Sequence, residues 1–182
     1  MEADDRNLIA ELKQENTRDL AFHRLVKLYQ ERLYWHIRKI LLSHEDTDDV
    51  LQNTFVKVWK SIENFREESS LYTWLYRIAT NESITFLNSK KRRNLLPLND
   101  VSDYLMENLT SDPYFEGDKL QLKLQQAVLQ LPEKQRIVFN MKYFDEMKYE
   151  DMSRILGTSV GALKASYHHA AKKIEEFIKT SD

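Results

Sequence analysis

The 182-residue chain contains no cysteine, and it has 3 glycines and 3 prolines. Without cysteine it can form neither a disulfide framework nor a thiolate metal site, which suits a reducing cytoplasm. So few glycines and prolines leave little material for the many turns of a β-rich fold, and we expect an all-α fold. The acidic N-terminus has no long apolar run, so we expect neither a signal peptide nor a membrane span there.

The chain also lacks an excess of positive charge. It has 27 Lys and Arg against 29 Asp and Glu, for a formal net charge of −2. Any contact with nucleic acid must therefore come from local basic patches rather than from the whole surface. The length allows one large domain or two small ones.

The five histidines do not predict a metal site. None has a glutamate three residues before it, so the di-metal motif of helical bundles is absent. His168 and His169 are adjacent on a predicted helix and point about 100° apart, which is poor geometry for one metal. A glycine-rich phosphate loop and a nucleophile elbow are also missing. We expect no catalytic residue, metal, cofactor or small-molecule substrate, and a helical metalloenzyme is the weakest interpretation.

Residues 149–178 have the pattern of two helices joined by a short turn. The first helix is expected to end at Gly157, and Ser159 is a good N-cap for the second. An apolar face recurs along that second helix at Val160, Leu163, Tyr167, Ala170, Ile174 and Ile178. The residues available to a partner are Ser159, Gly161, Lys164, Ala165, His168, His169 and Lys172. This arrangement predicts a helix-turn-helix whose second helix enters the DNA major groove, although an ordinary helical hairpin shares it.

Two long amphipathic helices are expected in the first half of the chain. One spans about Thr17 to Leu42, and the next, capped by Asp46 or Thr47, reaches about Ile62. Helical spacing places one polar set opposite the buried stripe of the second helix: Asp49, Gln52, Asn53, Val56 and Lys60. That face is either a docking surface or simply solvated.

A polar loop at 65–70 leads into a helix expected at about 71–93, which ends in four consecutive cations. Thr73, Trp74, Arg77 and Asn81 are expected on its outer side. Aromatic residues followed by a basic run are typical of a site that binds single-stranded nucleic acid. The aromatic rings stack on the bases, and the cations neutralise the phosphates. Alternatively, the cations could interact favourably with the negative C-terminal end of the helix dipole, and the aromatic residues could be buried in the hydrophobic core.

Residues 94–118 are acidic and contain no lysine or arginine. We interpret them as a linker with one helical turn at about Tyr104 to Leu109. The expected fold is all-α, with two small helical domains at 1–93 and 119–182 joined by this acidic linker, and with the helix-turn-helix in the second domain.

Three segments in this order resemble the extracytoplasmic-function (ECF) sigma factors of bacterial RNA polymerase. DTDDVLQNTFVKVWKSI resembles the segment that docks on the clamp helices of the β′ subunit. FREESSLYTWLYRIATNESITFLNSKKRR resembles the segment that melts and reads the minus-ten element. LPEKQRIVFNMKYFDEMKYEDMSRILGTSVGALKASYHHAAKKI resembles the domain that reads the minus-thirty-five element. The resemblance extends over nearly the whole chain, from about Leu20 to Ile178.

The resemblance implies a role for each segment. Asp49 and Gln52 would face the clamp helices, while Asn53 stands where the family more often has an acid. The loop would hold a flipped base, and the minus-ten set would be Arg66, Ser69, Tyr72, Trp74, Arg77, Asn81, Lys90, Lys91, Arg92 and Arg93. The implied partners are core RNA polymerase (β′ clamp helices and β subunit), promoter DNA and an anti-sigma factor, in the cytoplasm.

The second helix of the helix-turn-helix departs from the family pattern. Ser166, His169 and Ala171 stand where arginines are common, while Lys164 is retained. A conventional regulator with an N-terminal sensing bundle would explain the helix-turn-helix equally well. It would not explain the aromatic-then-basic helix or the polar face at Asp49 and Gln52.

Overall fold

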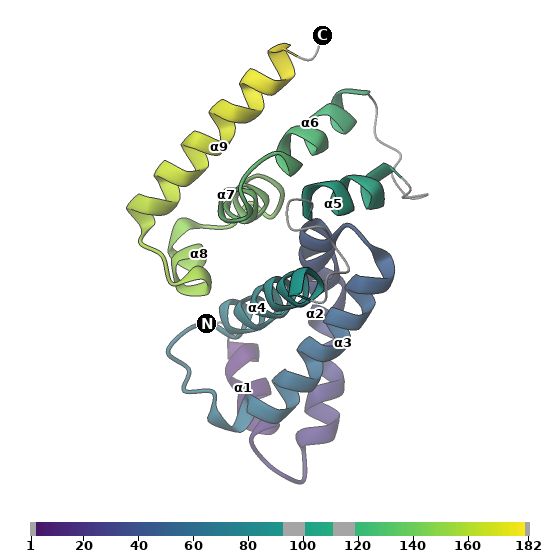
Figure 1. The fold of residues 1–182 in the computed structure, drawn as a ribbon. Helices are drawn as coiled ribbons and strands as arrows, with labels where there is room; N and C mark the ends of the chain where they lie inside the picture. Colours follow the sequence, from purple (N-terminus) through teal and green to yellow (C-terminus); the bar gives the residue numbers. More distant parts are fainter. Residues whose placement is uncertain (1–2, 93–100, 111–118, 181–182) are drawn as a thin grey trace.

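The computed structural model describes residues 3–92, 101–110 and 119–180, and within these ranges all regular structure is helical. The all-α prediction is therefore confirmed. The first half of the chain forms α1 (Ala3–Leu12), α2 (Arg18–Leu41), α3 (His44–Ser61), the short η1 (Ile62–Asn64) and α4 (Leu71–Arg92). Helices α2, α3 and α4 pack against one another, with α1 against α2 (Figure 1).

The core of this bundle follows the apolar periodicity of the sequence. Leu25, Leu33 and Ile37 on α2 are fully buried, as are Val58 on α3 and Leu75 on α4. Thr73 was expected on the outer side of α4, and that prediction was wrong. Its side chain is completely buried, and its hydroxyl lies 3.3 Å from the Asp151 carboxylate of the second domain.

Helix α3 begins earlier than predicted. Ser43, rather than Asp46 or Thr47, is the N-cap, and its hydroxyl accepts a hydrogen bond from the Asp46 N–H at 3.2 Å. The Thr47 hydroxyl instead donates to the Ser43 carbonyl inside the first turn. All three residue types are good caps, so local propensity alone could not choose among them.

The second half contains α5 (Val101–Thr110), α6 (Lys119–Leu129), α7 (Glu133–Phe139), η2 (Asn140–Phe144), α8 (Tyr149–Leu156) and α9 (Val160–Thr180). The helix in the predicted linker, α5, is 10 residues long rather than one turn. Its Leu105 and Leu109 are buried together with Leu129 of α6. The helix is longer because this apolar contact gives it a face to bury.

The helix-turn-helix forms as predicted. Gly157 ends α8 in the left-handed conformation, with φ +63°. The Ser159 hydroxyl accepts a hydrogen bond from the Ala162 N–H at 3.3 Å and so caps α9. A second core joins α9 to α6 and α7 through Ala127, Val128, Leu131, Phe139, Ala170 and Ile174.

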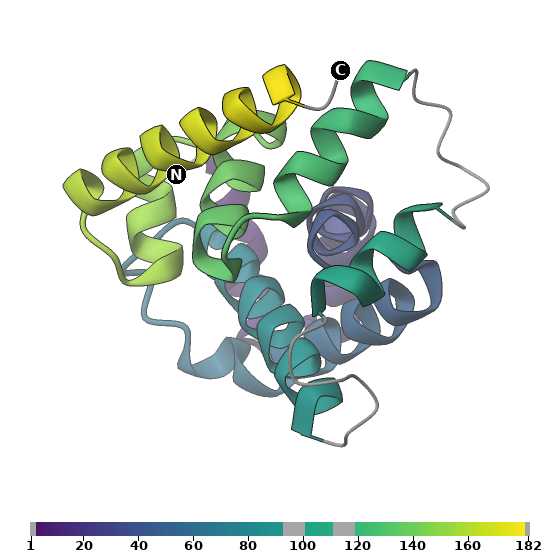
Figure 2. The same cartoon turned by 45° about the horizontal axis from the view of Figure 1, so that its top comes forward.

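The two halves are packed against each other. Helix α8 lies on α4, as both views show (Figures 1 and 2). Ile137, Met152, Ile155 and Leu163 of the second half belong to the same contiguous apolar cluster as the core of the first half. No helix in the described ranges combines the length and apolar character needed to cross a bilayer.

The two glycines of the helix-turn-helix provide a paired stability test. A methyl group added at Gly157 or Gly161 would meet no atom within 4 Å, so the backbone alone decides the effect. Gly157→Ala should lower the free energy of unfolding by about 1 kcal/mol, because φ is positive there. Gly161→Ala should raise it by about 0.5 kcal/mol, because alanine is the better helix former. Urea unfolding measures both, and shifts of the same sign would contradict this account of the turn.

Candidate nucleic-acid and partner interfaces

The predicted docking face of α3 is open to solvent. Asp49, Gln52 and Asn53 are all exposed, and Val56 beside them is 45% exposed. The buried side of the same helix, with Val50, Thr54 and Val58 among its residues, holds it to α2 and α4. The face therefore presents a carboxylate, two amides and an apolar side chain on a rigid element, which suits a polar partner with some apolar surface.

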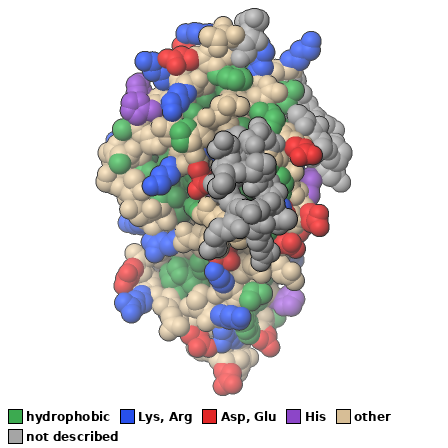
Figure 3. Space-filling model, viewed as in Figure 1, with side chains coloured by type: hydrophobic (Ala, Val, Ile, Leu, Met, Phe, Trp, Pro, Cys, Tyr) green, Lys and Arg blue, Asp and Glu red, His purple; other side chains and the backbone are tan. Residues whose placement is uncertain are grey.

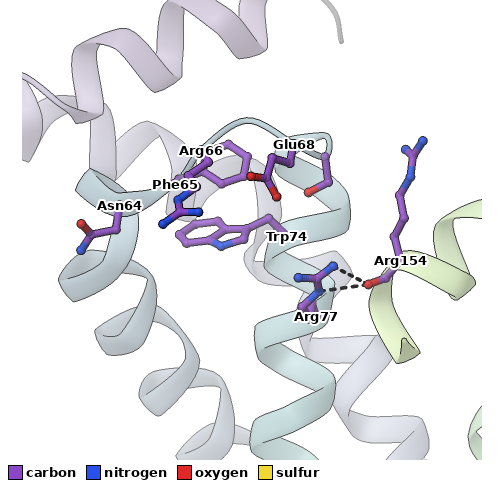
Figure 4. A pocket seen from close by; sticks show the side chains of 8 residues that line it. Asn64, Phe65, Arg66, Glu68, Trp74, Arg77 and Arg154 are labelled. Carbon is purple, nitrogen blue, oxygen red and sulfur yellow. Dashed lines mark hydrogen bonds between the residues drawn. The ribbon is translucent and has the colours of Figure 1, made fainter. Parts of the chain in front are cut away.

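A cavity of about 270 Å³ lies where the loop after η1 meets the start of α4. It is lined by Asn64, Phe65, Arg66, Glu68, Ser69, Trp74, Arg77 and Arg154. Figure 4 shows the Trp74 indole beside Phe65 and Arg66, and the two aromatic ring centroids are 4.8 Å apart. Trp74 is half-buried. The structure thus brings together four predicted residues, Arg66, Ser69, Trp74 and Arg77, around an aromatic surface with cations at its edge.

Arg154, which the sequence did not point to, reaches this cavity from α8. Its backbone carbonyl accepts two hydrogen bonds from the Arg77 guanidinium, from Nε at 3.0 Å and from Nη2 at 2.5 Å (Figure 4). In this conformation the second domain contributes to the cavity and engages Arg77.

Tyr72 lies outside the cavity lining and packs in the core of the first domain. Its ring centroid is 4.2 Å from that of Tyr76. Burial raises the pKa of both phenols above the ordinary value. Tyr72 therefore supports α4 from inside, whereas Asn81 on the same helix is exposed.

Lys90, the first cation of the basic run, is engaged inside the protein. Its ammonium lies 2.8 Å from the Asp46 carboxylate and 2.7 Å from the Tyr104 hydroxyl of α5. Burial acts to lower the pKa of Lys90, but the bonds to Asp46 and Tyr104 outweigh burial and raise it. Lys91 and Arg92 end α4, and Arg93 lies outside the described residues.

The predicted contact face of α9 is solvent-exposed. Its members are Ser159, Gly161, Lys164, Ala165, His168, His169 and Lys172. Lys164 lies 5.7 Å from the centre of the Tyr149 ring. On the side shown in Figure 3, Lys and Arg are interspersed with Asp and Glu rather than gathered into one basic patch. No group of three or more His, Asp or Glu among the described residues has a geometry that could hold a metal ion.

The comparisons with known proteins match both halves of the chain. The sigma-70 region 2 family matches residues 25–93, and the sigma-70 region 4 family matches residues 121–174. The ECF RNA polymerase sigma-E factor of Haemophilus influenzae is 30% identical over 183 residues, which are 96% of this chain and 95% of that protein. The chain belongs to the ECF sigma factors.

Other ECF and related proteins agree with this assignment. The RNA polymerase sigma-H factor of Pseudomonas aeruginosa is 28% identical over 96% of this chain and 94% of its own length. The structure of CnrH in complex with the cytosolic domain of CnrY has the same fold, with a TM-score of 0.70 at 22% identity over 98% of this chain and 99% of CnrH.

This ECF sigma factor directs transcription initiation, and its partners are core RNA polymerase and promoter DNA. The alternative hypothesis of a conventional helix-turn-helix regulator does not account for the match to sigma-70 region 2, which spans the whole of α4 and most of α2.

Proposed function

We propose that this sigma factor divides its work between two domains. Residues 1–93 bind core polymerase and melt the minus-ten element, residues 94–118 form the linker, and residues 119–182 read the minus-thirty-five element. The observation that carries the proposal is the cavity at Trp74, where an aromatic surface, Arg66 and Arg77 meet on the first domain. A flipped base needs such a stacking surface together with cations for its phosphates.

Core binding is assigned to α3. Asp49 and Gln52, with Asn53 beside them, face the clamp helices of the β′ subunit. The exposed apolar surface of Val56 adjoins them and is covered on binding. The amide at Asn53 makes this contact less charged than the acid that is common in the family.

The minus-ten residues fall into two groups. Arg66, Ser69, Trp74, Arg77 and Asn81 contact the melted strand, because they are exposed or line the cavity. Lys90 and Tyr72 act indirectly, since one holds α5 and the other supports α4. The basic residues 91–93 neutralise phosphates further along the strand.

Ligand, compartment and regulation follow from the same assignment. The protein catalyses no reaction itself, needs no cofactor and works in the cytoplasm, where the polymerase is. An anti-sigma factor is a further partner, supported by the neighbouring structures of CnrH with CnrY and of RpoE with the anti-sigma factor NepR from Bartonella quintana.

The function is tested with core polymerase and a promoter library. The wild-type protein should co-purify with core enzyme and support run-off transcription. Asp49→Ala with Gln52→Ala should weaken core affinity about tenfold or more, because two exposed polar contacts are lost. Gln30→Ala with Glu31→Ala is the matched control, since both residues are exposed on α2. Unchanged core affinity in the α3 variant would contradict the proposed face, and equal loss in both variants would indicate a general effect of surface charge.

Trp74 provides a test of melting. Trp74→Ala should slow open-complex formation on duplex promoters by about tenfold, because base stacking is worth roughly 1–3 kcal/mol. A premelted bubble should restore part of the rate, because unstacking is no longer needed. Trp35→Ala, which removes a half-exposed tryptophan from α2, should change neither rate. If the variant loses the same fraction of its rate on bubble and duplex templates, Trp74 stabilises the hydrophobic core and does not stack on a flipped base.

The recognition helix provides a test of upstream readout. Ser166→Arg with His169→Arg should steepen the salt dependence of promoter binding and change the selected upstream sequence, because arginine adds charge and bidentate donors to guanine. The minus-ten preference should stay the same. Ser166→Gln with His169→Gln, which is long but uncharged, separates charge from size. Promoter selection at two salt concentrations measures this, and identical selection by all three proteins would mean that these positions do not face DNA.

A further inference from the structure

The first helix of the chain lies beside the loop of the proposed minus-ten site. Helix α1 and the turn after it, residues 3–18, precede the residues that the sigma-70 region 2 family matches, 25–93. The Thr17 hydroxyl donates to the Glu11 carbonyl at 2.8 Å and so closes the turn. Three apolar side chains of α1 are buried in the core shared with α2, α3 and α4: Leu8, Ile9 and Leu12. This segment is therefore a fixed part of the first domain.

Lys13, the residue after α1, binds the middle of the loop. Its ammonium donates to the Phe65 carbonyl and to the Glu67 carboxylate, each at 2.9 Å. It also lies 6.0 Å from the centre of the Phe65 ring. The side chains of Lys13 and Glu67 are 31% and 39% exposed, so their ion pair is partly shielded from water. One cation thus fixes a backbone group and a side chain of the same loop.

Arg18 fixes the segment from which the loop starts. Its guanidinium donates to the Trp59 carbonyl near the end of α3 and to the Glu63 carboxylate of η1. The last four carbonyls of a helix have no N–H partner within that helix, and the guanidinium supplies a donor to one of them. Its central carbon also lies 4.2 Å from the centre of the Trp59 ring, in a cation–π contact. The end of α3 is therefore attached to the same turn as the loop.

The middle of the loop has no apolar side chain to bury. Arg66, Glu67 and Glu68 are all exposed. Glu67 has φ +59°, in the left-handed region that residues other than glycine seldom adopt. Such a backbone conformation persists where the surrounding structure fixes it. In the part of the chain that the structure describes, Lys13 is the only side chain that donates a hydrogen bond to residues 65–68.

The same loop positions the aromatic surface of the cavity. Phe65 is buried, and the centres of the Phe65 and Trp74 rings are 4.8 Å apart. Arg66, which lines the cavity, stands between the two residues that Lys13 binds. Neither Lys13 nor Arg18 lines the cavity. Both therefore act on the cavity through the loop that forms one side of it.

We propose that residues 3–18 are a positioning element of the minus-ten site, in which Lys13 and Arg18 hold the loop in the conformation that receives the flipped base. Neither residue contacts DNA. Because the loop is ordered before the strand arrives, its conformational entropy is not lost on binding. This inference rests on the proposed function, since it concerns the same loop and cavity.

The first experiment measures opening of the loop in the free, full-length protein by limited trypsin digestion. Trypsin cuts a locally opened segment, so the rate of the cut after Arg66 reports how often the loop opens. Lys13→Met should raise this rate about fivefold or more, while circular dichroism shows retained helix. Lys27→Met, which removes an exposed lysine from α2, should leave the rate unchanged. Equal rates in the wild type and Lys13→Met would overturn the proposal.

The second experiment measures open-complex formation by the holoenzyme on a promoter that the wild type selects. Lys13→Met should slow it about fivefold, the factor expected if the loop has the binding conformation about a fifth of the time. The salt dependence of promoter binding should stay the same, because no phosphate contact is lost. Lys27→Met should match the wild type in both measurements. A slope lower by about one unit in Lys13→Met would mean that Lys13 itself contacts a phosphate, which would overturn the proposal.

Glu67 distinguishes loop positioning from simple charge. Glu67→Ala removes a negative charge from the loop that faces DNA, so electrostatic attraction alone predicts faster promoter opening. If Glu67 anchors the loop to Lys13, the variant should instead slow opening. The double variant of Lys13→Met with Glu67→Ala should be about as slow as Lys13→Met, because both changes remove the same contact. Faster opening by Glu67→Ala, or fully additive losses in the double variant, would contradict the positioning role.

The outcomes separate the two proposals. A wild-type protein that is inactive with core polymerase would refute the proposed function. The trypsin experiment needs no polymerase, so it would still decide whether Lys13 holds the loop. An active wild type with unchanged loop opening and promoter opening in Lys13→Met would refute the positioning element alone.

Discussion

The carbonyl end of α8 needs hydrogen-bond donors, and Arg77 supplies two of them. The last four carbonyls of any α-helix have no partner within the helix, and they carry the negative end of its dipole. In α8 the Ser153 carbonyl is taken by the Gly157 N–H, and the Arg154 carbonyl accepts from Arg77 of α4. The guanidinium therefore serves as a C-cap for a helix 77 residues further along the chain. A capping contact of this kind satisfies a carbonyl that would otherwise need water, and it fixes the guanidinium of Arg77 at the edge of the cavity.

A second cation, Lys90, holds helix α5 of the linker in place. Lys90 belongs to the basic run at the end of α4, yet its ammonium bridges Asp46 of α3 and Tyr104 of α5. Leu105 and Leu109 of α5 continue this contact to Leu129 of α6. The position of α5 thus depends on both domains, and any separation of the domains must break one of these two contacts.

The sequence predicts the features of this fold that depend on near neighbours. Gly157 and Ser159 are sufficient to place the turn between α8 and α9, and helical spacing correctly predicts the exposed faces of α3 and α9. The start of α3 was wrong because Ser43 competed with equally good caps. The length of α5 was underestimated because its stability comes from contact with α6 rather than from its acidic sequence.

The features that the sequence could not predict are contacts between distant residues. His36 and Asp145 are 109 positions apart, and Thr73 and Asp151 are 78 apart. From the sequence alone, each of these residues would be expected at the solvated surface. A single histidine or aspartate on a helix or loop belongs to no periodic pattern that would predict its burial. Their pairing depends on how two finished domains dock, and it is this docking that puts Arg154 at the cavity.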